Sequence, residues 1–77
     1  MMDFIYIEDE KGKQITFEVV TIFNIEDSEH NYIIYRSLDK EKYYIAKYLG
    51  ENVVDLDTNL SDKELRIGNT ILEQIIK

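Results

Sequence analysis

The sequence predicts an α+β fold, in which an antiparallel β-meander of four to five strands carries one C-terminal helix packed on a face. Short runs rich in β-branched and aromatic residues follow one another along residues 4–57. Polar turns of only a few residues separate these runs, and such short connections favour sequential antiparallel neighbours. After residue 61 the apolar residues take the spacing of an amphipathic helix instead.

The first predicted hairpin joins strands over residues 4–9 and 14–25. Gly12, in the acidic turn between them, can supply the positive φ of a short loop with a bulge. The first strand alternates apolar residues onto both of its faces, so we expect it to be covered on both sides or to belong to a sheet that curls toward a partial barrel. In the long second strand the alternation changes phase near Val19 and Val20, which predicts a β-bulge or a bend there.

Three further strands are predicted over residues 32–37, 43–49 and 53–57. The first of them begins with the continuous run Tyr32-Ile33-Ile34-Tyr35, which is typical of a central strand with both faces occupied. Polar residues or glycine fill the intervening turns. Each strand is therefore expected to pair with the one before it.

The helix is predicted over residues 62–76, with Ser61 as its N-cap and Glu64 completing a capping box. Its apolar residues fill about half of the helical wheel, which is wider than the stripe that one-sided packing typically uses. Gly68 lies inside this arc, and a close approach of the helix backbone to the sheet would explain it. We expect five helix residues to face the sheet: Leu65, Gly68, Leu72, Ile75 and Ile76. Ile67 and Ile71 would then lie on a flank of the helix.

Composition limits the classes of protein to which this chain can belong. Its 77 residues predict a single domain, residues 1–77, with a small core. Sixteen acidic and nine basic side chains give a net charge of −7, which disfavours binding to nucleic acid or to an anionic membrane surface. The chain has no cysteine, no charged segment leading into an apolar one at its start and no apolar run of the ~20 residues that span a bilayer. We therefore expect a cytoplasmic protein without a signal peptide or a membrane partner.

No pattern in the sequence predicts catalysis, a cofactor or a metal site. His30 is the only histidine, and its acidic neighbours lack a second His or Cys to complete a transition-metal shell, so a solvated turn is favoured. Asp55 and Asp57 would lie about 7 Å apart on one face of the fifth strand. Carboxylate pairs of this kind serve in glycoside hydrolysis, but charges that protect an exposed sheet edge explain them better. We expect no enzymatic activity, no cofactor and no small-molecule substrate.

The nine aromatic residues, six tyrosines and three phenylalanines, allow three interpretations. They can form core and cross-strand pairs, anchor another protein, or stack on bases. One helix leaves the second sheet face uncovered, and this favours a protein-interaction or regulatory module that binds a protein partner or forms a homodimer. The alternative is a nucleic-acid-associated accessory protein that uses sheet tyrosines. The candidate interaction surface comprises Ile67, Ile71, Tyr44 and Tyr48.

The order of these segments resembles the DUF1292 (UPF0473) family of small acidic proteins, found mainly in Firmicutes and their relatives. The resemblance rests on the hairpin at residues 5–19, the strand segments at 31–35, 44–48 and 53–58, and the helix at 62–76. It implies a bacterial protein, but because the family has no established activity it assigns no catalytic or binding residue. The chain departs from many members in its short loops and in lacking a strongly acidic C-terminal tail.

Overall fold

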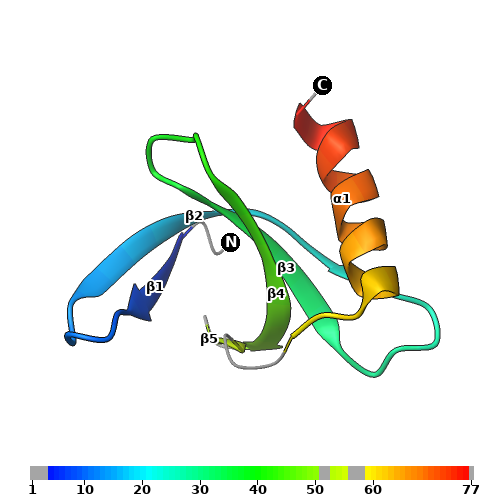
Figure 1. The fold of residues 1–77 in the computed structure, drawn as a ribbon, viewed down its shortest axis with the longest axis horizontal. Coiled ribbons are helices and arrows are strands. Elements are labelled where there is room, and N and C mark those ends of the chain that lie inside the picture. The colour runs from blue at the N-terminus through cyan, green and yellow to red at the C-terminus, as the bar shows by residue number, and fades with distance from the viewer. Residues whose placement is uncertain (1–3, 51–52, 56–58, 77) are drawn as a thin grey trace.

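The computed structural model of the chain describes residues 4–50, 53–55 and 59–76. Its fold is the predicted α+β meander with one C-terminal helix (Figure 1). The elements are β1 (Phe4–Glu8), β2 (Gln14–Asn24), β3 (Asn31–Ser37), β4 (Tyr43–Gly50), β5 (Val53–Asp55) and α1 (Asp62–Ile76). The end of the predicted fifth strand, residues 56–57, lies outside the described residues. The pairing of Asp55 with Asp57 on that strand therefore stays a prediction.

The five strands form one antiparallel sheet in the order β1-β2-β3-β4-β5, so β3 is the central strand, as its sequence predicts. Side chains of β3 are buried on both faces of the sheet. They are Tyr32, Ile33, Ile34 and Tyr35, none more than 4% exposed. Continuous apolar sequence here reflects a strand that is paired on both edges and covered on both sides.

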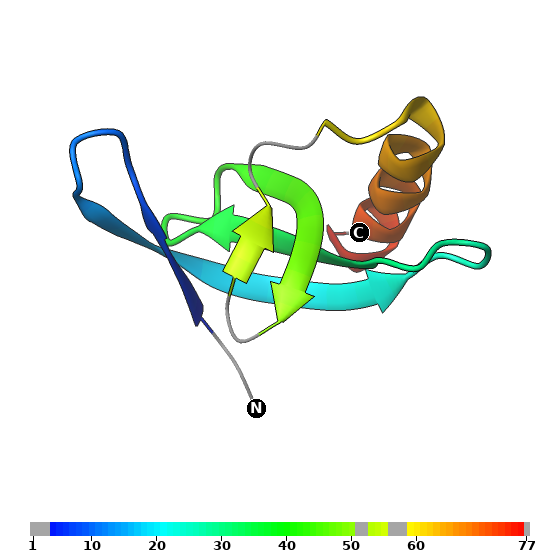
Figure 2. The same ribbon diagram turned by 90° about the horizontal axis from the view of Figure 1, so that it is seen from below.

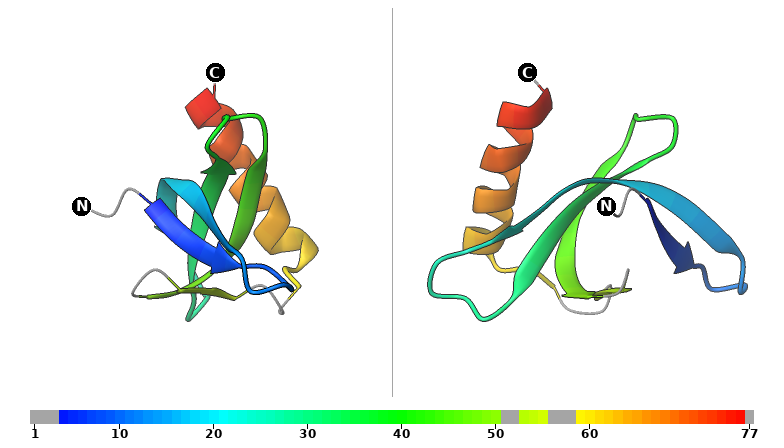
Figure 3. Two further views of the ribbon diagram at one scale, coloured as in Figure 1. Left: turned by 90° about the vertical axis from the view of Figure 1, so that its left-hand side faces the viewer. Right: turned by 180° about the vertical axis from the view of Figure 1, so that it is seen from behind.

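The predicted bulge in β2 is present. Val19 pairs with Tyr35, but the next residue in register with β3 is Thr21, opposite Ile34, so Val20 is the extra residue. A bulge bends its strand and increases its twist. Figure 3 shows β2 running as one long strand from its hairpin with β1 to the loop beside α1.

The inner face of the sheet, which we define by the core cluster that it carries, is concave. That cluster consists of Ile5, Ile33, Tyr35 and Ala46, from β1, β3 and β4. Val54 of β5 packs against the same cluster. Because residues from both edge strands reach one cluster, the sheet curls into a half-barrel, and Figure 2 shows β1 and β5 on the same side of it.

The outer face of the sheet is partly covered by α1. Gly68, the one buried residue of the helix, lies against Ile45 of β4. The hydroxyl of Tyr32 in β3 donates a hydrogen bond to Glu64 in the first turn of the helix. Register places both Tyr32 and Ile45 on the face opposite the core cluster. The close approach predicted from Gly68 is therefore confirmed.

The capping box at the start of α1 is also confirmed. The amide of Glu64 donates to Ser61 Oγ at 3.2 Å, and the amide of Ser61 donates to Glu64 Oε1 at 2.7 Å. Two backbone donors that the first helical turn leaves unpaired are satisfied reciprocally. The negative charge of Glu64 also lies at the positive end of the helix dipole.

The prediction of which apolar helix residues face the sheet was wrong in part. Ile67, Ile71 and Leu72 are half-buried, so Ile67 and Ile71 do not form an exposed flank. The exposed apolar residues are instead Leu65, Ile75 and Ile76, at 40%, 44% and 54% exposed. The helix is rotated so that Gly68 meets Ile45, because only a residue without a side chain allows this approach.

Candidate functional site

The four residues of the predicted interaction surface do not lie together. Tyr44 pairs with Tyr35, and Tyr48 packs against the core cluster, so both tyrosines are on the inner face. Ile67 and Ile71 belong to α1, which lies on the outer face. The sheet itself separates the two pairs, and the structure offers no single patch that contains all four.

Three aromatic rings pack together on the inner face. Phe17 lies edge-on to Tyr35 and Tyr44, at centroid distances of 5.2 and 5.6 Å. Tyr35 and Tyr44 stack at 5.2 Å with an angle of 18° between their planes. Burial raises the pKa of Tyr35, and the neighbouring Tyr44 adds to the shift. These three rings thus pack mainly against one another, although Tyr44 remains 38% exposed.

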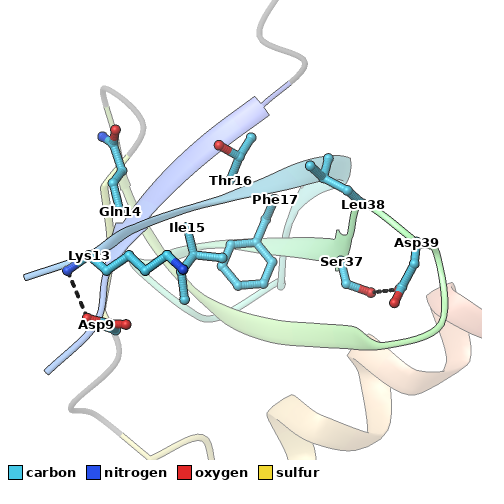
Figure 4. A pocket seen from close by; sticks show the side chains of 9 residues that line it. All are labelled: Asp9, Lys13, Gln14, Ile15, Thr16, Phe17, Ser37, Leu38 and Asp39. Carbon is cyan, nitrogen blue, oxygen red and sulfur yellow. Dashed lines mark hydrogen bonds between the residues drawn. The ribbon is translucent and has the colours of Figure 1, made fainter. Parts of the chain in front are cut away.

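Beside this cluster lies an open pocket of about 550 Å³, which we call the inner-face groove (Figure 4). It lies between the β1–β2 hairpin and the loop after β3. Its lining residues are Asp9, Lys13, Gln14, Ile15, Thr16, Phe17, Ser37, Leu38 and Asp39. Ile15 is 40% and Leu38 58% exposed, while Phe17 is half-buried between them and the core. The groove therefore presents apolar side chains to solvent within polar surroundings.

Asp9 fixes the hairpin wall of the groove. One oxygen of its carboxylate accepts hydrogen bonds from the amides of Lys11 and Lys13, both at 2.9 Å. The amide of Gly12 donates to the Asp9 carbonyl at 3.0 Å, and Gly12 takes the predicted positive φ, 80°. A side-chain acceptor that binds its own turn holds the loop in one conformation.

Asp39 fixes the opposite wall in a similar manner. Its carboxylate accepts a hydrogen bond from the hydroxyl of Ser37 and one from the amide of Glu41 at 2.9 Å. The Ser37 hydroxyl, which contributes most, and the Glu41 amide lower the pKa of Asp39, so that it stays ionised. Lys40 in this loop has a φ of 66°, an uncommon value for a residue other than glycine. Each wall of the groove is thus held by hydrogen bonds within its own turn.

A second hollow, of about 460 Å³, lies on the outer face near the C-terminal end of α1. It is lined by Phe4, Glu18, Val19, Val20, Arg36 and Ile75. Arg36 forms an ion pair with Glu18, donates a hydrogen bond to the Tyr43 hydroxyl at 3.2 Å and lies 5.9 Å from the centre of the Tyr43 ring. The two charged residues that line this hollow, Arg36 and Glu18, are therefore paired with each other.

A hydrogen-bonded chain joins the β2–β3 loop to the helix. Because the Tyr32 hydroxyl donates to Glu64, the Ser28 hydroxyl at 2.9 Å donates to Tyr32. Burial, followed by the bond to Glu64, raises the pKa of Tyr32. The Ser61 amide first, and then Tyr32, lowers the pKa of Glu64. The sequence indicated Glu64 only as a cap, and its second role depends on where β3 meets the helix.

His30 is exposed in the β2–β3 loop, where its amide donates to Ser28 Oγ at 3.2 Å. Within residues 4–50, 53–55 and 59–76, no three His, Cys, Asp or Glu side chains lie where they could share a metal ion. The helix of the described chain is too short and too polar to cross a membrane. Comparison of the chain with protein-family models, with curated proteins and with solved structures finds no match.

Proposed function

We propose that this protein is a non-enzymatic interaction module of the bacterial cytoplasm, which binds an apolar part of a partner protein in the inner-face groove. The observation that carries the proposal is the exposure of Ile15 and Leu38 beside the ring of Phe17, around a pocket of about 550 Å³. Covering exposed apolar surface with a partner contributes about 25 cal/mol of favourable free energy for each Å² removed from water.

The rigidity of the groove supports this function. Asp9 and Asp39 hold the two turns that form its walls, and the rings of Tyr35 and Tyr44 hold Phe17 from the side. A preformed site loses less conformational entropy when it binds. Aromatic side chains in well-packed pockets also dominate the energy of protein interfaces.

Affinity capture from the source organism tests the proposal, if the protein is compared with two variants. Leu38→Glu places a charge in the groove at a residue that is 58% exposed. Leu49→Glu is the matched control, because Leu49 is 60% exposed but lies far from the groove. The groove is next to the start of β4 at Tyr43, and Leu49 is about 20 Å further along that strand. A partner protein should be retained by the unaltered chain and by Leu49→Glu, and lost by Leu38→Glu. The proposal fails if Leu38→Glu retains the same proteins as the control, or if the unaltered chain retains none.

A further inference from the structure

We propose that the outer edge of β1 pairs with β1 of a second copy, in an antiparallel arrangement centred on Tyr6. This interaction uses a different surface from the inner-face groove and does not depend on the function proposed for it. In the sheet order, β1 is an edge strand, visible in dark blue in Figure 2. Within the described part of the chain, only β2 pairs with it.

Hydrogen bonding in the first hairpin shows which backbone groups the edge offers. The amide of Asp9 donates to the carbonyl of Lys13 at 2.8 Å, so these two residues form a hydrogen-bonded pair. Such pairs alternate along antiparallel strands with pairs that exchange no bond. The next hydrogen-bonded pairs are therefore Ile7 with Ile15 and Ile5 with Phe17. The amides and carbonyls of the intervening residues, Phe4, Tyr6 and Glu8, point away from β2 toward the free edge.

This edge carries few of the features by which proteins usually prevent strand pairing. Such features are charged side chains, lysine above all, proline, a bulge or a very short strand, and of these β1 has one carboxylate, Glu8, at its end. β1 has five residues, Phe-Ile-Tyr-Ile-Glu, in unbroken register with β2. Two of its aromatic side chains are exposed, Phe4 at 41% and Tyr6 at 51%. The opposite edge strand, β5, is described over Val53–Asp55.

A second copy of β1 is the occupant that this edge fits best. In a two-fold arrangement centred on Tyr6, Tyr6 faces Tyr6 of the partner subunit, and Phe4 faces Glu8 of the partner subunit. Each of these pairs exchanges both of its N–H···O bonds, so every outward backbone group finds a partner. On the inner face Ile5 lies opposite Ile7 of the partner subunit, which joins apolar side chain to apolar side chain.

Charge favours this register over the one centred on Glu8. Centring the pair on Glu8 would place Glu8 opposite Glu8 of the partner subunit, between two chains that each carry a net charge of −7. Like charges directly opposite each other destabilise strand pairs. The register centred on Tyr6 instead opposes each carboxylate to an aromatic ring. Because the net charges of two copies still repel, the dimer should become tighter as the salt concentration rises.

Amide hydrogen exchange measured by NMR, from tens to hundreds of micromolar protein, tests the pairing directly. The amides of Ile5 and Ile7 should be protected at every concentration, because they bond to β2. The amide of Tyr6 should exchange freely in dilute protein and become protected as the concentration rises. Exchange of the Tyr6 amide that does not depend on concentration overturns the proposal.

Two lysine variants test the register by sedimentation. Tyr6→Lys opposes two cations and should weaken the dimer by about tenfold. Phe4→Lys makes the same kind of change two residues away but places its cation opposite Glu8 of the partner subunit, so the dissociation constant should stay within about threefold of the original or become smaller. Circular dichroism verifies that both variants fold. Equal weakening by the two variants, or a strict monomer in the unaltered protein, contradicts the proposal.

Discussion

Gly68 of α1 packs so closely against Ile45 of β4 that a Cβ atom at position 68 would lie 2.8 Å from Ile45 Cδ1 and 3.1 Å from Ile45 Cγ2. This contact brings the helix backbone close to the outer face of the sheet. Glycine costs about 1 kcal/mol relative to alanine in the interior of a helix. Here that cost is offset because the helix backbone can approach the outer face of β4 without an intervening side chain.

Gly68→Ala should therefore destabilise the protein, by about 1 kcal/mol. The gain in helix propensity is about 1 kcal/mol, but overpacking a closely fitted site typically costs 1–3 kcal/mol. Chemical denaturation of the variant measures the difference. A variant more stable than the original would show that Ile45 moves aside at little cost.

The matched background for that variant is Ile45→Val, which deletes Cδ1, the atom nearest to the added methyl group. In this background Gly68→Ala should be less destabilising than in the original protein, because the closest contact is removed and only the contact with Cγ2, at 3.1 Å, remains against the gain in helix propensity. A double-mutant cycle measures this coupling between the two positions. Additive effects would contradict a direct contact between positions 45 and 68.

Ser61→Ala should lower the free energy of unfolding by about 1 kcal/mol, because the amide of Glu64 loses its acceptor at the start of the helix. Ser61→Asp is the control, since aspartate is an equally good N-cap and should preserve stability. Denaturation midpoints of the two variants test the cap. Equal losses from both substitutions would argue against a capping role for the side chain.

Glu64 should contribute to stability in a way that depends on pH. Its pKa in the folded protein lies below the ordinary value of 4.5, because the Ser61 amide and then the Tyr32 hydroxyl bind the ionised form. A lowered pKa stabilises the fold at pH values above the unfolded pKa, and the contribution is lost as the pH falls through the folded pKa. Glu64→Gln should therefore be less stable at neutral pH, and its difference from the unaltered protein should shrink in acid below pH 4.5.

Thermal unfolding of both proteins across this pH range measures the difference. Tyr32→Phe separates the two contributions to the shift, because it removes the Tyr32 hydroxyl and leaves the bond from the Ser61 amide. We expect it to show a smaller part of the same pH dependence. A gap between Glu64→Gln and the original that stays constant with pH would contradict the role given to the ionised carboxylate.

Generic DNA and RNA should not bind at physiological salt. The net charge of −7 opposes approach to phosphates, which proteins bind mainly through lysine and arginine. The rings of Tyr35 and Tyr44 also stack on each other, so little of their surface remains for bases. A fluorescence titration with labelled oligonucleotides tests this expectation. A micromolar, salt-sensitive dissociation constant would restore the role of accessory protein to nucleic acid.

Local signals in the sequence predict most of this fold. The strands, the bulge at Val20, the positive φ of Gly12 and the cap at Ser61 all follow from neighbouring residues, and all are present. The sheet face that receives the helix does not follow in this way. Because β3 carries apolar side chains on both faces, its sequence does not show which face the helix covers. Only the contact between Gly68 and Ile45 in the folded protein identifies that face.

The candidate site was harder to predict for a related reason. Apolar residues cover half of the helix surface, and this pattern does not determine which of them face the sheet. The sequence therefore placed Ile67 and Ile71 on an exposed flank, whereas both are half-buried. The inner-face groove depends on the register that sets Phe17 opposite Ser37 and so brings Leu38 near Ile15. The short turn residues Asp9 and Asp39 were its only sequence signal. Pairing register between distant strands is not contained in any local pattern.

Photo-crosslinking from position 38 in the source organism is the most direct test of the groove as an interaction surface. A photoreactive phenylalanine derivative replaces Leu38 in one protein and Leu49 in another. Both positions are exposed, and Leu38 lies in the loop before β4, whereas Leu49 lies near the far end of that strand. If the groove binds a partner, the derivative at position 38 should form a covalent conjugate with another protein. The derivative at position 49 should form none. The same conjugates from both positions, or conjugates of two copies of this chain alone, would contradict it.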